Sequence, residues 1–422
     1  MNAFQPKAKS SYSVITALIE IPVALVLLVL FTPIHLLNVC LALVRLKSIT
    51  IQKRRLDALG RMVVLHRFQY GFLKRTANLY LVLLRKLAFV GVSMNHMLAK
   101  EQQQQLLSQY KVLPGLVSSF DVHQSIGLDT ASPQALLEQQ LAGGIKTHLV
   151  LLIKGAINFL VYQAQDLTSP KVASLFDLPI NNVSMKQAVD WCVNGTSLIR
   201  FNSQRQTTQL GYFINAHSVN LAESDPVFKS CLRQANALFA DGSGMRVAAK
   251  SVGVKLKSNV NGTDMLPKIC AQAEREGKSI YLLGGLPERA EKTAQALQAK
   301  FPKLEIAGTH HGFFNLEDKA ENQKIINNIN TAQADIVLVG FGSPAQEIWC
   351  HNYLAQLQCT SVLAVGGLFD YYSGAIPRAP MVMRELGLEW IWRLRQEPLV
   401  KFKRYVIGTP QFLIRTFLLR QV

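Results

Sequence analysis

The residue best placed for proton transfer in this sequence is Asp241. It follows the apolar run 237–240 and precedes the glycine-rich turn Gly242-Ser243-Gly244. A carboxylate at the end of a buried strand can reach a bound substrate and accept a proton from it. The same position also suits an aspartate that caps a turn or a helix, and the local residues leave both interpretations open.

Two glycine turns follow other apolar runs and are candidates for binding phosphate. Gly284 and Gly285 form the first turn, and Gly340 and Gly342 belong to the second. Backbone N–H groups at the start of a helix favour an anion. Neither turn is a complete dinucleotide-binding fingerprint or P-loop. Two such turns in a chain rich in arginine favour a diphosphate ligand.

Further polar side chains are predicted at the carboxyl ends of strands. Gln346 and Glu347 follow the second glycine turn, and Asp370 follows another Gly-Gly pair. Each is interpreted either as a ligand contact or as a helix cap. Three histidines are candidate general bases, although isolated histidines are more often structural: His217, His310 and His311.

The sequence offers no motif for a metal or a redox cofactor. The six cysteines are scattered without a CxxC pair, and the second half of the chain has no Asp-x-Asp. No GxGxxG is followed by an acidic residue at the spacing of a dinucleotide site, which disfavours a nicotinamide-dependent oxidoreductase. We therefore expect no metal and no cofactor, and a reducing environment.

Alternating strands and helices are expected to position these residues. Short apolar runs that end in Gly or Asn predict strands, at residues 212–215, 237–242, 280–285, 336–340 and 362–367. Helices are predicted at 288–300 and 319–330, and Ser184 with Gln187 forms a capping box before a third. The pattern predicts an α/β fold: a Rossmann-like, mostly parallel sheet with helices on both faces. Ligands bind such sheets at the carboxyl ends of the strands.

The N-terminal part differs in character from the rest of this 422-residue chain. Residues 21–44 contain no Asp, Glu, Lys or Arg, and a helix of this length could cross a membrane once. Pro33 in the middle leaves two geometries: a kinked spanning helix, or a re-entrant hairpin that enters one leaflet and returns. Residues 45–100 then hold twelve Lys or Arg and one acid. With the net charge of +18, this favours membrane lipid over nucleic acid as a partner.

These composition changes predict four regions. Residues 1–165 form a membrane-associated domain, 166–178 a linker, 179–377 the α/β domain and 378–422 a basic, helical C-terminal appendage. In the appendage, basic residues alternate with aromatic ones, which is typical of a helix at a membrane interface or of an ordinary helix with aromatic core contacts.

Residues 215–404 resemble the WecG/TagA/CpsF family of glycosyltransferases. The likeness rests on FINAHSVN (213–220), ANALFADGSGM (235–245), DIVLVGFGSPAQE (335–347) and AVGGLFDYYSGAIPRAP (364–380), and it extends over about residues 172–410. It implies inverting, metal-independent transfer of an N-acetylhexosamine-type sugar, usually N-acetylmannosamine or its uronic acid, from a UDP-sugar. The implied acceptor is a polyprenyl-diphosphate-linked sugar at the cytoplasmic face of a bacterial inner membrane.

The resemblance also implies roles for single residues. Asp241 would be the base, and Asn215 and Gln346 match two further motif positions of the family. The appendage would supply arginines for the diphosphates: Arg378, Arg393, Arg395 and Arg404. The sequence departs from the family at Phe213, where threonine is usual, and at residues 258–261, where an arginine is usual, so the donor sugar stays open.

Residues 21–94 resemble a shortened bacterial sugar transferase of the monotopic phosphoglycosyl transferase type. The apolar segment with Pro33 and the basic run 52–55 carry the likeness. The catalytic Asp-Glu pair of that family should fall within residues 72–79, where this sequence has Leu73-Lys74-Arg75-Thr76. Without the nucleophile, the resemblance implies an inactive relative kept as a membrane anchor or as a binder of polyprenyl phosphate.

Together these features predict a membrane-associated glycosyltransferase of surface polysaccharide synthesis, with its catalytic domain in the cytoplasm. A non-catalytic membrane scaffold that recruits other enzymes is the alternative. Whether the chain forms a homo-oligomer is left open.

Overall fold

The chain forms two compact units, described here by a computed structural model. Unit 1 comprises residues 1–125 and 129–163, and unit 2 comprises residues 126–128 and 164–422. The structure describes residues 11–70, 74–94, 97–109, 112–126, 132–157, 168–198, 208–385, 387–418 and 422.

Unit 1 begins with one long helix, α1 (Ser11–Val44), which continues without a break through Pro22 and Pro33. The helix-break-helix hairpin, one of the two predicted geometries, is therefore not the conformation found. Within the described residues, Thr16–Val44 is the one helix long and apolar enough to cross a membrane, judged by length and composition alone.

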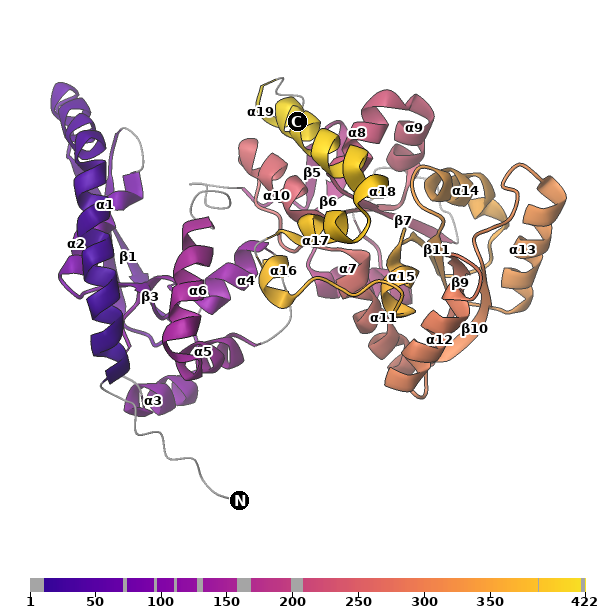
Figure 1. Ribbon diagram of the computed structural model, residues 1–422, viewed down its shortest axis with the longest axis horizontal. Helices are drawn as coiled ribbons and strands as arrows, with labels where there is room; N and C mark the ends of the chain where they lie inside the picture. Colours follow the sequence, from indigo (N-terminus) through magenta and orange to yellow (C-terminus); the bar gives the residue numbers. More distant parts are fainter. Residues whose placement is uncertain are drawn as a thin grey trace, which may run out of the picture. The chain divides into compact units, whose positions relative to one another are not determined.

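The rest of unit 1 is a small assembly of strands and helices along one side of α1 (Figure 1). The antiparallel hairpin is β1 (Thr50–Leu56) and β2 (Met62–Phe68), and the parallel pair is β3 (Ala88–Val90) and β4 (Gly115–Val117). The helical elements are η1 (Lys74–Asn78), α2 (Leu79–Leu83), α3 (Lys100–Gln109), α4 (Ser119–Ile126), α5 (Pro133–Ala142) and α6 (Gly144–Ile157).

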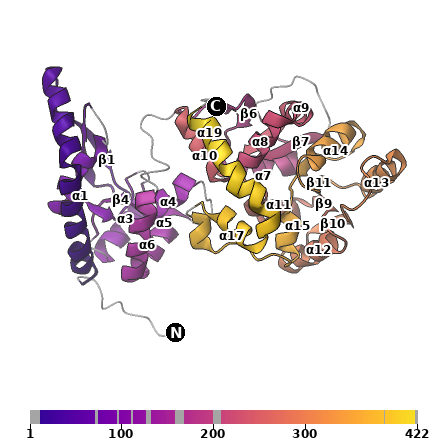
Figure 2. The same ribbon diagram turned by 45° about the horizontal axis from the view of Figure 1, so that its top comes forward.

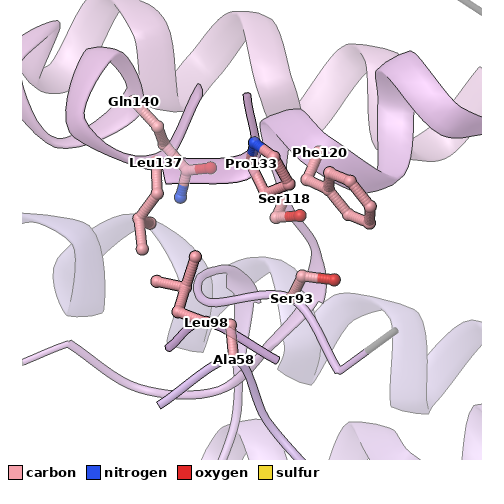
Figure 3. Close-up of a pocket in the computed structure, with 8 residues that line it drawn as sticks. All are labelled: Ala58, Ser93, Leu98, Ser118, Phe120, Pro133, Leu137 and Gln140. Atoms are coloured by element: carbon pink, nitrogen blue, oxygen red, sulfur yellow. The ribbon is translucent and has the colours of Figure 1, made fainter. Parts of the chain in front are cut away.

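A small cavity in unit 1 lies between β4, α4 and α5 (Figure 3). Its polar lining is already hydrogen-bonded within the protein. Gln140 Nε2 donates to the Gly91 carbonyl at 3.0 Å, and the hydroxyls of Ser93 and Ser118 donate to Asp121 at 2.8 and 2.7 Å. These groups tie the elements of unit 1 together, so the cavity is a packing feature of the fold.

Unit 2 is built on an eight-stranded sheet in the order β10-β9-β11-β12-β7-β8-β6-β5, in which only β5 runs antiparallel to its neighbour. The five predicted strands are confirmed as β7 (Gln209–Ile214), β8 (Ala237–Ala240), β9 (Ser279–Gly284), β11 (Ile336–Gly340) and β12 (Ser361–Ala364). Three strands were not predicted: β5 (Val172–Leu175), β6 (Leu178–Asn181) and β10 (Glu305–His310).

β5 falls inside residues 166–178, the stretch expected to be a linker. A tight turn at Phe176 and Asp177, both with positive φ, folds it back on β6 as a hairpin. The sheet therefore begins earlier than the composition change indicates, while the boundary at residue 378 stays a prediction.

Helices cover both faces of the sheet, as predicted. Along β8 the side chains alternate between two cores: Leu238 faces one and Phe239 the other. The first core is covered by α8 (Ala216–Ser224), α9 (Pro226–Gln234), α10 (Gly242–Ser251), α13 (Lys319–Thr331) and α14 (Ala345–Tyr353). The second is covered by α7 (Met185–Asn194), α11 (Gly262–Glu276), α12 (Arg289–Lys300) and α15 (Leu368–Tyr372).

The C-terminal appendage is helical, as predicted. It consists of α16 (Met381–Glu385), α17 (Glu389–Gln396), α18 (Pro398–Phe402), the π-helical segment η4 (Lys403–Ile407) and α19 (Gly408–Phe417). Figures 1 and 2 show α19 lying beside α8 and α10. Phe412 of α19 is fully buried in the first core, with its ring 5.3 Å from that of Phe176.

Candidate active site

Asn215 and Asp241 lie together at the carboxyl ends of the neighbouring strands β7 and β8. Asn215 caps α8, because its Oδ1 accepts the N–H groups of His217 and Ser218 at 3.0 and 3.2 Å. Its Nδ2 is thereby turned towards Asp241 and donates to Oδ2 at 3.3 Å. β7 and β8 are neighbouring parallel strands, and ligands bind sheets of this type at the carboxyl ends of the strands.

Asp241 occupies the N-cap position of α10 but makes no capping hydrogen bond with its side chain. The turn is held instead by Asn259, whose Oδ1 accepts the Gly242 N–H at 2.6 Å. Removal from water raises the pKa of Asp241 to about 6, with Asn215 and Arg404 opposing the rise and Glu389 adding to it. The carboxylate is thus free of a structural task and more basic than usual, which suits proton transfer.

The two predicted phosphate turns are closely packed against each other. A Cβ on Gly284 would lie 2.4 Å from the Gly340 carbonyl oxygen, so this position requires glycine. The Gly285 N–H donates to that same carbonyl at 2.9 Å. Gly342 has a φ of +89° and open space where a Cβ would be. In this conformation the Gly285 N–H serves the fold, and phosphate binding at these turns stays a prediction.

Gln346 joins the turns that follow β11 and β12. Its side chain is 3% exposed, and its Oε1 accepts the N–H groups of Gly342 and Gly366 at 3.2 and 2.9 Å. Its Nε2 donates to Glu347 Oε1 at 2.8 Å, and burial raises the pKa of that carboxyl. Both residues therefore shape the rim, and direct ligand contact, one of the two sequence interpretations, stays a prediction.

Arg393 lies over the Gly-Gly turn after β12. It is 9% exposed, and its guanidinium stacks on the Tyr371 ring at 4.7 Å from the ring centre. A Cβ on Gly367 would lie 3.3 Å from its Nη2. Burial raises the pKa of the neighbouring Asp370, against the opposing charges of Arg393 and Arg289. Asp370 is therefore placed within a cationic group.

Arg378 and Arg384 converge on a single carboxylate oxygen, Asp264 Oδ1, at 2.7 and 2.6 Å. Four buried arginine nitrogens in this region lack a hydrogen-bond partner among the described residues: Arg378 Nε, Arg384 Nε, Arg393 Nη1 and Arg404 Nε. Buried donors without partners cost free energy, which an anionic ligand would recover. Arg404 also acts on the pKa values of Asp241 and His217.

The four arginines predicted to bind diphosphate lie in different surroundings. Arg378, Arg393 and Arg404 carry unpaired donors near the carboxyl ends of the strands. Arg395 is exposed and stacks on Trp392 at 5.6 Å from the ring centre, and its contact with a diphosphate stays a prediction. Arg384, Arg289 and Lys401 were missed, because nothing in the sequence separates them from the other basic residues.

Of the candidate histidines, only His217 is near Asp241. Burial, Arg404 and Lys401 lower its pKa to about 4, so it is neutral at neutral pH. His310 is the last residue of β10 and His311 follows it, and β9, β11 and β12 separate this strand from β7. In the described part of the chain, no group of three or more His, Cys, Asp or Glu has the arrangement of a metal site.

A carboxylate without a capping role and buried arginine nitrogens without hydrogen-bond partners among the described residues lie at the carboxyl ends of these parallel strands, which suits a transferase with a phosphorylated substrate. The model of the Glycosyl transferase WecG/TagA/CpsF family matches residues 173–422. The chain belongs to this family and is a glycosyltransferase.

Relatives of this chain are also named as sugar transferases. An N-acetylglucosaminyldiphosphoundecaprenol N-acetyl-beta-D-mannosaminyltransferase of Staphylococcus aureus (strain NCTC 8325 / PS 47) is 29% identical over 222 residues, which is 52% of this chain and 82% of the relative. The protein of that name from strain MRSA252 is 28% identical over the same length. The family match begins at residue 173, so the likeness of residues 21–94 to sugar transferases stays a prediction.

Proposed function

We propose that this protein transfers an N-acetylhexosamine-type sugar, N-acetylmannosamine or its uronic acid, from a UDP-sugar to a polyprenyl-diphosphate-linked sugar. The names of the S. aureus relatives support the acceptor class and the transferred sugar. The observation that carries the proposal is an Asp241 with a raised pKa and no capping role, at the same edge of the sheet as buried arginine nitrogens that lack hydrogen-bond partners among the described residues.

In the proposed reaction, Asp241 accepts the proton of the acceptor hydroxyl as the hydroxyl oxygen attacks the anomeric carbon. The bond from that carbon to the UDP oxygen breaks, and UDP leaves with the electron pair. The attack comes from the face opposite to UDP, so the anomeric configuration inverts. Asn215 holds the Asp241 carboxylate in place. Arg378, Arg393 and Arg404 neutralise the diphosphate charge that develops on the leaving group.

The acceptor is a lipid, so the reaction takes place at a membrane. We infer a bacterial inner membrane with unit 2 on its cytoplasmic side, where UDP-sugars are made. Unit 1 then serves as an anchor or as a binder of polyprenyl phosphate. The basic pair Lys74-Arg75 in place of an acidic pair supports such a non-catalytic role for this unit.

The test is UDP release with a panel of UDP-N-acetylhexosamines and a short polyprenyl-diphosphate-GlcNAc acceptor. We expect release that requires the acceptor, and a fall of about 100-fold or more in kcat for Asp241→Asn. Asp225→Asn is the matched control, because either side chain can cap α9. Release that is unchanged in Asp241→Asn would remove the base assignment. Intact UDP binding without turnover of any donor would favour the scaffold alternative.

A further inference from the structure

The buried residues of α1 form one continuous stripe. Thr16, Glu20, Ala24, Leu28, His35, Asn38 and Ala42 are all at most 9% exposed. Their spacing of three, four or seven residues places them on one face of the helix. This face packs against the rest of unit 1 along nearly the whole of α1.

The polarity of α1 is reversed relative to a helix of a water-soluble protein. The polar residues Glu20, His35 and Asn38 lie on the buried face. The opposite face is apolar and exposed from end to end, at Leu18, Leu25, Val29, Leu30, Leu36 and Leu43. An exposed apolar face of this extent marks a binding surface, and its partner must be apolar.

Two polar contacts fix α1 to unit 1 at separate levels. At the first level, Glu20 accepts the Val90 N–H at 2.9 Å and pairs with Arg85 at 3.1 Å. At the second, His35 Nε2 is 2.8 Å from Thr76 Oγ1 of η1. The two levels are fifteen residues apart in the sequence, which is about 22 Å along a helix.

This spacing is incompatible with a crossing helix. The hydrocarbon core is about 30 Å thick, so a crossing by residues 21–44 would place at least one of the two levels inside it. Lipid would then contact the partly exposed Arg85 at the first level or the 3-10 turn η1 at the second. It would also contact the edges of the β1–β2 hairpin. Unpaired backbone groups and irregular segments are not tolerated there. A re-entrant hairpin is also inconsistent with the structure, because α1 continues without a break through Pro33.

We propose that α1 lies along the surface of one membrane leaflet, with its apolar face in the acyl boundary and both of its ends on the same side. The exposed apolar residues of α1 run from Leu18 to Leu43, which is about 38 Å along the helix. Tyr80 of α2 and Leu84, which directly follows α2, are exposed as well. The occupant is an anionic leaflet, because Arg45 and Lys47 follow directly after the helix and β1 exposes Lys53 and Arg54.

The test is the depth of nitroxide labels in the full-length chain, in vesicles of phosphatidylcholine and phosphatidylglycerol. Cysteine replaces Leu18, Leu30 or Leu43, one at a time, in a background with Cys40→Ser and Cys359→Ser, because the other four cysteines are buried. Val227→Cys on α9 is the control outside the proposed contact. Accessibility to oxygen and to a water-soluble nickel chelate gives each depth. We expect the three α1 labels to lie at one depth, about 5–10 Å below the headgroups, and Val227→Cys to stay in water.

Three results would overturn the proposal. A label at Leu30 that is much deeper than the other two would indicate a hairpin. Labels at Leu18 and Leu43 in opposite leaflets would indicate a crossing helix. Labels that neither oxygen nor the chelate reaches, with dipolar broadening between chains, would indicate a second copy of the chain on this face.

A second measurement addresses the charge. Replacing both Lys53 and Arg54 by glutamine should lower the partition onto anionic vesicles about 30-fold, as measured by flotation, because each basic residue contributes about fivefold. An unchanged partition would remove the anionic leaflet as the occupant. Depth and flotation need no turnover, so failure of the transferase assay would leave this result intact.

Discussion

Asp241 combines burial with a single neutral hydrogen-bond donor, and this combination has a consequence for activity. Its pKa of about 6 means that the carboxylate is protonated below that pH and cannot accept a proton. We expect kcat/KM to rise tenfold per pH unit up to about pH 6 and to level above it, as measured from pH 4.5 to 8.5. A level profile across pH 6 would exclude Asp241 as the base.

The same raised pKa affects stability. As pH rises from about 4 to 6, the unfolded state loses the Asp241 proton before the folded state does, so this residue lowers the stability of the fold. Asp241→Asn should therefore raise Tm at pH 7 and leave it nearly unchanged at pH 4. Thermal melts of both proteins at the two pH values test this, and a lower Tm for Asp241→Asn at pH 7 would contradict it.

Asn215 serves two purposes that substitution can separate. Serine at this position can still cap α8 with its hydroxyl, but it lacks the Nδ2 group that donates to Asp241. We expect Asn215→Ser to keep Tm close to that of the natural protein while moving the midpoint of the pH–activity profile above pH 6, because the donor lowers the pKa of Asp241. Asn215→Ala should lower the free energy of unfolding by about 1 kcal/mol as well. If the midpoint of the pH–activity profile stays at about pH 6 in both variants, Asn215 does not influence the pKa of Asp241.

At the scale of elements, the appendage is part of the fold of unit 2. Phe412 is 1% exposed within the first core, and Gly408 accepts a hydrogen bond from Asn220 at 2.7 Å. We expect Phe412→Ala to lower the free energy of unfolding by about 3 kcal/mol. Phe417→Ala on the same helix is the matched control, because that side chain is 52% exposed and should change it by less than about 0.5 kcal/mol. Chemical denaturation measures both, and equal effects would contradict the packing described.

The five predicted strands could be found from the sequence because each is a short, continuous apolar run, as a strand buried on both faces must be. β10 was missed because its residues are half-buried or exposed at the sheet edge. β5 and β6 were missed because Ser174 and Pro179 interrupt their apolar runs. The re-entrant alternative for α1 rested on Pro33, which local sequence treats as a break. The contacts of α1 with unit 1 come from residues far along the chain, such as Val90 and Thr76, and no local pattern contains them.

The candidate site was predictable in part for the same reason. Asp241 and Asn215 directly follow apolar runs, so their positions at the sheet edge could be inferred. The arginines could not be ranked in advance, since Arg384 and Arg395 look alike in sequence and differ only in what the folded appendage places beside them.

At the scale of the whole molecule, the net charge of +18 bears on attachment to lipid. We expect binding to vesicles that contain phosphatidylglycerol to weaken as NaCl rises from about 0.1 to 0.5 M, because salt screens exposed charges. Binding to neutral phosphatidylcholine vesicles should be weaker and insensitive to salt, since the apolar face of α1 alone supports it. Flotation at each salt concentration tests this, and equal salt dependence on both lipids would contradict it.

The position of Phe412, far along the chain from most of the strands and helices that it packs against, has a consequence for how the protein is made. The first core of unit 2 needs this side chain, so the core stays open until residue 412 has left the ribosome. α1 is synthesised long before this residue and has no such delay. During synthesis a finished α1 is therefore available to lipid while the first core of unit 2 is still incomplete, and a chain cut short before residue 412 would keep α1 but lack the side chain that completes this core.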